Sequence, residues 1–263
     1  MVNDTGWALI GPDARIARWA AAAYAPALAG IAAQPGGWRC GGTWHVGLEA
    51  LPNGPDGAMA GVPFPWHALP LAPMPLHAGQ ISVIRPRYPQ PWDGESPAAF
   101  AFRRARDAAH LDGLLPIGPN AQRMVREPHA WILGIALNDH GPDASPLTVW
   151  QGSHLVLRNA LRAALADVPH AHWGDTDLTA TYQSARRRVF DTCPRITLPL
   201  RPGTASLLHR LTLHGMAPWG TDANAPPEGR MIAYFRPMLP SVAAWLDKSL
   251  DQWPSFHLAE RES

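Results

Sequence analysis

Residues 201–215 read Arg-Pro-Gly-Thr-Ala-Ser-Leu-Leu-His-Arg-Leu-Thr-Leu-His-Gly, and this stretch says most about the fold. The Pro-Gly pair at 202–203 predicts a turn between two short apolar segments. We therefore expect strands at 195–200 and 204–209, and a third strand at 231–236. Short strands joined by Pro/Gly turns are typical of antiparallel barrels and jelly rolls.

The same pattern continues upstream, where short apolar or alternating runs are separated by Pro- and Gly-rich segments. The expected strands there are 43–48, 80–85, 130–137 and 147–150. Helical periodicity, with Pro12 at a first helical position, predicts helices at 12–25, at 157–167, and from a cap at Asp175 or Thr176 to about 190. A short helical or extended piece is expected within 87–107. The chain is thus expected to be mainly β, one barrel or jelly-roll domain with helical decoration.

Composition narrows the class of protein. The 263 residues are 46% hydrophobic, and 22 basic residues nearly balance 21 acidic ones. A balanced chain lacks the positive surface that binds nucleic acid or an anionic membrane. Two cysteines, Cys40 and Cys193, indicate a reducing compartment. With no signal peptide and no run of 18 apolar residues, the expected location is the cytoplasm.

The most informative polar pair is His110 and Asp112, separated by a single residue. Side chains two residues apart point the same way on extended backbone. With a distant third ligand they would form two imidazoles and one carboxylate on one face of a metal, which is diagnostic of non-haem Fe(II) oxygenases. An isolated His-x-Asp is more often a surface turn, so other motifs in the chain are needed to indicate a metal site.

Four segments follow one another in a characteristic order: 107–113 with His-x-Asp, 145–154 with Gln-Gly-Ser-His, 201–215, and 229–237 with an arginine. Together they resemble the phytanoyl-CoA dioxygenase-like family of Fe(II)/2-oxoglutarate-dependent oxygenases. The resemblance implies a double-stranded β-helix (jelly-roll, cupin-like) core. It covers residues 80–237, leaving 1–79 as helical and irregular coverage and 238–263 as a C-terminal extension of the same domain.

The resemblance also implies roles for single residues. His110, Asp112 and His214 match the ligands of Fe(II), and Arg230 matches the arginine that pairs with the far carboxylate of 2-oxoglutarate. O2 would be the oxidant, succinate and CO2 the coproducts, and hydroxylation of an unactivated C–H bond the outcome. The carboxylate of Asp112 argues against halogenation, while desaturation and ring closure stay open.

His209 competes with His214 as the distal ligand. The two are five residues apart, so on one regular strand they would face opposite sides. His214 is preferred because Gly215 follows it and because the Pro-Gly turn then lies at the distance that the family shows. His154 belongs to a turn that we interpret as structural.

One residue and one interval depart from the family pattern. Met216 stands where members often carry a serine that contacts the cosubstrate. The interval from His214 to Arg230 is also longer than usual. A loop rich in Gly, Pro, Asn and Asp, Trp219–Glu228, accounts for the extra length.

Weaker candidates line the expected pocket. Gln80 and Ser82 alternate on one strand and are assigned to the cosubstrate, although a half-buried strand explains them equally well. Trp44 and His45 are candidates for a substrate wall, with a packed aromatic as the plainer interpretation. Arg104, with neighbouring arginines, is a candidate for an acidic substrate, although such side chains are mostly solvated.

Two other functions stay open: a non-catalytic cupin-like module that keeps a metal, and a non-oxidative metal-dependent hydrolase or isomerase on the same barrel. The expected partner is a small organic molecule. Amino acids, lipid-like acids and natural-product scaffolds all fit, and nothing in the sequence indicates an oligomeric state.

Overall fold

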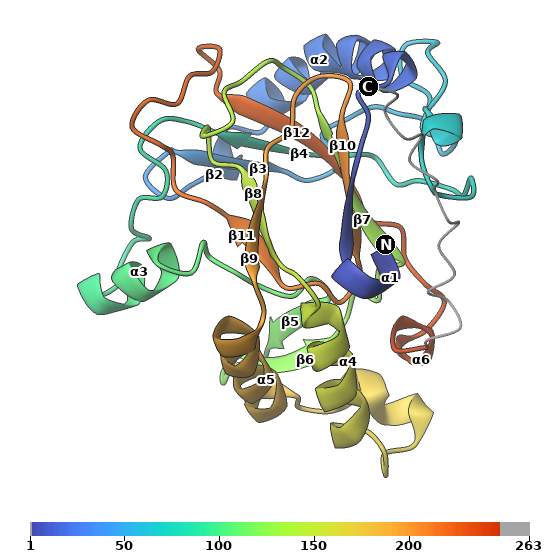
Figure 1. Cartoon of the computed structure of the whole chain (residues 1–263), viewed down its shortest axis with the longest axis vertical. Helices are drawn as coiled ribbons and strands as arrows, with labels where there is room; N and C mark the ends of the chain where they lie inside the picture. Colours follow the sequence, from blue (N-terminus) through green and yellow to red (C-terminus); the bar gives the residue numbers. More distant parts are fainter. Residues whose placement is uncertain (1, 248–263) are drawn as a thin grey trace, which may run out of the picture.

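Two antiparallel sheets form the centre of the computed structural model, which describes residues 2–247 (Figure 1). The large sheet has the order β1-β10-β7-β12-β4-β3-β2 and the small sheet the order β11-β8-β9. The strands of the large sheet are β1 (Trp7–Ile10), β2 (Trp38–Arg39), β3 (Trp44–Gly47), β4 (Gln80–Ile84), β7 (Trp131–Ala136), β10 (Ala205–His209) and β12 (Arg230–Phe235). Those of the small sheet are β8 (Leu147–Trp150), β9 (Arg195–Leu198) and β11 (His214–Met216).

The chain alternates between the two sheets. It passes from β7 in the large sheet to β8 and β9 in the small sheet, returns to β10, crosses to β11 and ends in β12. An isolated bridge between His110 and His214 extends the small sheet beside β11. This winding is that of a jelly roll, so the expected double-stranded β-helix core with helical decoration is confirmed.

Burial explains why the central strands are apolar on both faces. Every residue of β7 and β10 is buried, and in β12 only Tyr234 is partly open. One face of the large sheet packs against the small sheet through an apolar cluster that joins Ile132 and Leu208 to Leu147, Val149 and Leu198. The other face packs against α2 (Ala14–Ala33).

Helix α2 is longer than the expected 12–25. Pro12 does not open the helix, because Asp13 is the N-cap and its side chain accepts from Arg15 N–H at 2.7 Å. The helix also continues through Pro26. Within residues 2–247, α2 is the one helix long and apolar enough to cross a membrane. Residues such as Trp19 on its buried face pack in the main core cluster instead.

The other helices are α1 (Val2–Thr5), α3 (Pro97–Arg104), α4 (Ser153–Ala164), α5 (Thr179–Thr192) and α6 (Val242–Trp245), with 3-10 turns at Pro35–Gly37, Trp66–Ala68 and His170–Asp175. Helices α4 and α5 lie beside the small hairpin of β5 (Leu114–Ile117) and β6 (Gln122–Val125) at one end of the sheets (Figure 1).

The α5 cap lies later than expected. Helix α5 begins at Thr179 rather than after Asp175 or Thr176, because Asp175 ends a 3-10 turn that Thr176 caps, and Asp177 accepts from Thr179 N–H at 2.9 Å. Of the expected C-terminal extension, 238–263, residues 248–263 lie outside the described part of the chain.

Candidate metal centre

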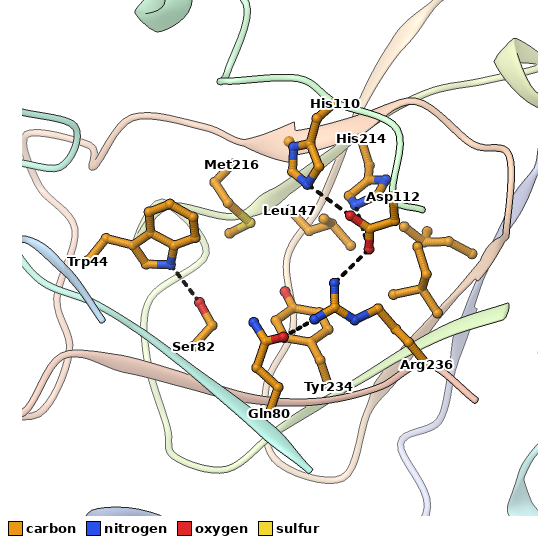
Figure 2. A pocket seen from close by; sticks show the side chains of 13 residues that line it. Trp44, Gln80, Ser82, His110, Asp112, Leu147, His214, Met216, Tyr234 and Arg236 are labelled. Carbon is orange, nitrogen blue, oxygen red and sulfur yellow. Dashed lines mark hydrogen bonds and ion pairs between the residues drawn. The ribbon is translucent and has the colours of Figure 1, made fainter. Parts of the chain in front are cut away.

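A cavity between the two sheets brings together five of the polar residues that the sequence singles out: His110, Asp112, His214, Gln80 and Ser82 (Figure 2). Its walls come from β3, β4, β7, β10 and β12 of the large sheet, from β8 and β11 of the small sheet, and from the segment around His110. The lining residues are Trp44, Gln80, Ser82, His110, Asp112, Ile132, Leu147, Leu208, His214, Gly215, Met216, Tyr234 and Arg236.

Backbone hydrogen bonds bring His110 and His214 together. The N–H of His110 donates to the carbonyl of His214 at 2.8 Å, and the N–H of His214 donates to the carbonyl of His110 at 3.1 Å. Gly215 permits this approach, because a Cβ at that position would lie 2.2 Å from the carbonyl oxygen of Asp107. The His-Gly pair is therefore a packing requirement of the site.

The ligand atoms of His110, Asp112 and His214 lie within 4.8 Å of one another. Oδ1 of Asp112 is 3.2 Å from Nε2 of His110, and Oδ2 is 3.8 Å from Nε2 of His214. No other group of three or more metal-ligating side chains is found within residues 2–247.

Each imidazole is oriented by its other nitrogen. Nδ1 of His110 lies 3.1 Å from the carbonyl oxygen of Ala108, and Nδ1 of His214 lies 2.9 Å from that of Thr212. Donation to these carbonyls keeps a proton on Nδ1 and directs both Nε2 atoms toward Asp112, where they can bind a cation once Nε2 carries no proton. Two such nitrogens and one carboxylate fit a ferrous ion with open coordination positions.

Charge and burial keep Asp112 ionised and His214 neutral, which are the forms that bind a cation. Burial opposes ionisation of Asp112, yet the guanidinium of Arg236 and the two imidazoles hold the pKa of Asp112 well below its ordinary value. Burial lowers the pKa of His214 to about 4. The surrounding protein atoms desolvate His110 and work against its protonation, but its hydrogen bond to Asp112 raises the pKa of His110 above 6.5.

The two histidines differ in exposure. The side chain of His110 is 50% exposed, whereas that of His214 is 8% exposed and that of Asp112 is 10% exposed. The site is therefore closed on the His214 side and reaches solvent on the His110 side.

Arg236 is a polar residue of this site that the sequence analysis missed. Its Nη1 donates to Oδ2 of Asp112 at 2.8 Å, and its Nη2 donates to Oε1 of Gln80 (Figure 2). The even spacing from Arg230 along the predicted strand was the available signal, since residues at even spacing share a face. That signal cannot indicate the partner, which comes from a distant segment.

Arg230 is almost completely buried at the start of β12. It lies on the same face of the strand as Tyr234, which lines the cavity. Within residues 2–247, neither Nη1 nor Nη2 of Arg230 has a hydrogen-bond partner. A buried guanidinium without an anion is costly, so the position fits the far carboxylate of 2-oxoglutarate.

The weaker candidates divide into two groups. Trp44 and Ser82 line the cavity and are joined by a hydrogen bond from the indole Nε1 to Ser82 Oγ at 3.0 Å (Figure 2). Gln80 also lines the cavity, but its carbonyl oxygen is taken by Arg236. The structure does not bring His45 to the cavity, because its buried ring lies 2.7 Å from the carbonyl of Gln34.

Arg104 is likewise away from the cavity, exposed at the end of α3. His209 ends β10, and the chain then crosses to the small sheet before His214, so the two histidines lie on different strands rather than on opposite faces of one. His209 lies 2.8 Å from Nη2 of Arg158 and accepts from Leu211 N–H at 3.0 Å.

His154 and Met216 occupy the remaining positions of interest. His154 is at the start of α4 and away from the cavity, and its Nε2 lies 2.9 Å from the carbonyl oxygen of Asn3. Met216 lines the cavity and packs against two apolar clusters, one containing Leu147 and Leu208 and the other containing Ile84 and Tyr88. The segment Trp219–Glu228 contains no helix or strand, in keeping with a loop between β11 and β12.

No family model and no curated protein matches the sequence. Among solved structures, similarity is found to the non-heme α-ketoglutarate-dependent carbocyclase SnoK from nogalamycin biosynthesis, at TM-score 0.48 and 18% identity over 90% of this chain and 81% of that one. AviO1 from Streptomyces viridochromogenes has a TM-score of 0.44 and 18% identity, over 91% of this chain and 94% of that one. EctD from S. alaskensis with bound Fe has a TM-score of 0.40 and 14% identity, over 89% of this chain and 73% of that one.

Proposed function

We propose that this protein is an Fe(II)/2-oxoglutarate-dependent oxygenase that hydroxylates an unactivated C–H bond of a small organic molecule. The observation that carries the proposal is the convergence of two Nε2 atoms and one carboxylate, with both Nδ1 atoms bonded to backbone carbonyls. A carbonyl acceptor on Nδ1 fixes the tautomer that a metal requires.

In this proposal His110, Asp112 and His214 hold Fe(II), and Arg230 binds the far carboxylate of 2-oxoglutarate. Ser82 supports the second role, because its oxygen accepts from Trp44 and its own proton remains able to donate toward the cavity. Bound iron and 2-oxoglutarate would supply the oxidative chemistry, with release of succinate and CO2. The protein orients both groups and limits access of water through the apolar wall of Ile132, Leu147 and Leu208.

The first test uses anaerobic protein mixed with Fe(II) and 2-oxoglutarate. We expect a weak visible charge-transfer band that is lost in His110→Ala and in His214→Ala. His209→Ala is the matched control, because His209 is a buried histidine bonded to Arg158 rather than to the triad. Absence of the band in the unmutated protein contradicts the proposal.

A second measurement separates oxygenase activity from the alternatives. Succinate formed from 2-oxoglutarate in the presence of O2, even without a substrate, identifies an oxygenase. A metal-binding module gives the metal spectrum without succinate, and a metal-dependent hydrolase turns over without O2. Product mass then distinguishes hydroxylation, which adds one oxygen atom, from desaturation or ring closure. We also propose that the enzyme acts in the cytoplasm on a small-molecule substrate, which a screen for stimulated 2-oxoglutarate consumption can identify.

A further inference from the structure

The carboxylate of Asp112 is held from two sides. In Figure 2 the imidazoles of His110 and His214 lie on one side of it, and the guanidinium of Arg236 lies on the other. Oδ2 accepts from Arg236 Nη1 at 2.8 Å, while Oδ1 lies toward Nε2 of His110 at 3.2 Å. Oδ2, which also lies 3.8 Å from Nε2 of His214, is thus committed to the arginine, and Oδ1 is left facing His110.

Arg236 is itself held in place. Its Nη2 donates to Oε1 of Gln80, and its backbone N–H donates to Nε2 of His77 at 2.8 Å. Gln80 opens β4 and Arg236 directly follows β12, and these two strands are neighbours in the large sheet. The guanidinium is therefore held between Gln80 and Asp112, while the backbone of Arg236 is held by His77.

We propose that Arg236 is a positioning residue that keeps Asp112 on the metal through a single oxygen, and that Gln80 acts through Arg236. The inference rests on the proposed function, because it concerns the same metal centre. A carboxylate released from Arg236 can offer both oxygens to a cation, which would use a coordination position needed by cosubstrate or oxygen. Gln80 is thereby reassigned from a cosubstrate contact to a support of Arg236.

The test measures Co(II) binding to the metal-free protein by visible absorption, without iron and without turnover. Arg236→Gln is expected to weaken Co(II) binding by about 10–100-fold, the usual effect of removing a partner of a metal ligand. The band shape of bound Co(II) should also change, since a carboxylate with two donor oxygens alters the coordination. A role in folding alone would leave that shape unchanged.

Arg103→Gln is the matched control. Arg103 is a similarly covered arginine, with its side chain 15% exposed against 22% for Arg236, and it forms an ion pair with Glu95 at 2.7 Å away from the triad. Its loss is expected to change Co(II) affinity by less than about twofold. Arg236→Lys keeps one charge on Asp112 without the second arm to Gln80, so an intermediate affinity is expected.

Gln80→Ala tests the indirect role. Alone it should weaken Co(II) binding by about 3–10-fold, the effect of one lost hydrogen bond. In the Arg236→Gln background it should have no further effect, because its only route to the metal has been removed. If Arg236→Gln does not fold, as judged by circular dichroism, Gln80→Ala and Arg236→Lys still decide the question.

The outcomes separate the two proposals. If unmutated protein binds no Co(II) in a manner that depends on His110 and His214, the proposed function fails and this inference falls with it. If unmutated protein binds Co(II) and the Arg236 and Gln80 variants bind it with the same affinity and spectrum, the positioning role is overturned while the proposed function stands.

Discussion

His110 and His214 exchange both of their backbone hydrogen bonds, at 2.8 Å and 3.1 Å, although they come from segments far apart in the sequence. The pairing fixes the separation of the two Cα atoms before any side-chain rotamer is chosen. The two proposed nitrogen ligands are thus placed by sheet geometry. Substitutions that disturb the backbone here should affect the metal as much as loss of a ligand.

Gly215→Ala tests this dependence. A Cβ at 215 would meet the carbonyl oxygen of Asp107 at 2.2 Å and the backbone of Ala109 at 3.1 Å, so β11 must move away from the His110 segment. We expect metal affinity to fall by more than about tenfold, comparable to the loss of a ligand's support. Co(II) titration and thermal melting measure the effect. Gly36→Ala is the control, because Gly36 has open space around its Cβ position and should tolerate alanine in both measurements.

Arg230→Met should separate cosubstrate binding from metal binding. It removes the buried guanidinium whose Nη1 and Nη2 have no hydrogen-bond partner within residues 2–247, so we expect 2-oxoglutarate to bind at least about 100-fold more weakly, in line with loss of a buried charge pair. The metal-free protein should become more stable by about 1–3 kcal/mol, because an uncompensated buried charge is replaced by an apolar chain. Isothermal titration and urea unfolding give the two values. Unchanged 2-oxoglutarate affinity would remove Arg230 from the cosubstrate site.

Trp44→Phe should affect the cosubstrate through Ser82. The indole Nε1 donates to Ser82 Oγ at 3.0 Å, and phenylalanine keeps the aromatic wall without this donor. Ser82 is then able to rotate, so we expect 2-oxoglutarate affinity to fall by about 2–10-fold, the effect of one hydrogen bond. Ser82→Ala should give a similar loss, and the double variant should lose no more than Ser82→Ala alone. Additive losses would show that the two residues act separately.

His140 should make stability depend on pH. Burial, and after it the charge of Arg230, lowers the pKa of His140 from its ordinary 6.5 to about 4. Between pH 6.5 and pH 4, His140 is therefore protonated in the unfolded chain but stays neutral in the folded protein. The free energy of unfolding falls as the pH drops through this window. His140→Gln should lose less stability between pH 7 and pH 4.5, as measured by urea unfolding. Equal losses in both proteins would contradict the pKa assignment.

Several elements could be predicted because their signals are local. The strand at Leu147–Trp150 has the predicted bounds, and the strands Ala205–His209 and Arg230–Phe235 lie within one residue of the predicted ones. Their apolar residues are needed on both faces, and a proline or glycine shortly precedes each of them: Pro146, Gly203 and Gly229. The His-x-Asp pair and His214 could be proposed as ligands because each lies in a short motif. The order of these motifs along the chain can be read from the sequence without knowing their positions in the fold.

Other features depend on contacts that the sequence does not display. Strand Trp7–Ile10 has only four residues and becomes a strand by pairing with β10. The helix through Pro26 is stabilised by the packing of residues such as Trp19, which outweighs the missing N–H of the proline. The partnership of Arg236 with Asp112 joins the end of β12 to another segment, and no spacing rule links the two.

The unequal exposure of His110 and His214 has a consequence for handling the protein. A chelator can reach an ion bound here from the solvent side without opening the barrel. Purification in EDTA should therefore give metal-free protein that is still folded, and later addition of the ion should restore it. Preparations of the same chain would then differ in activity according to their metal content, with no difference in folding.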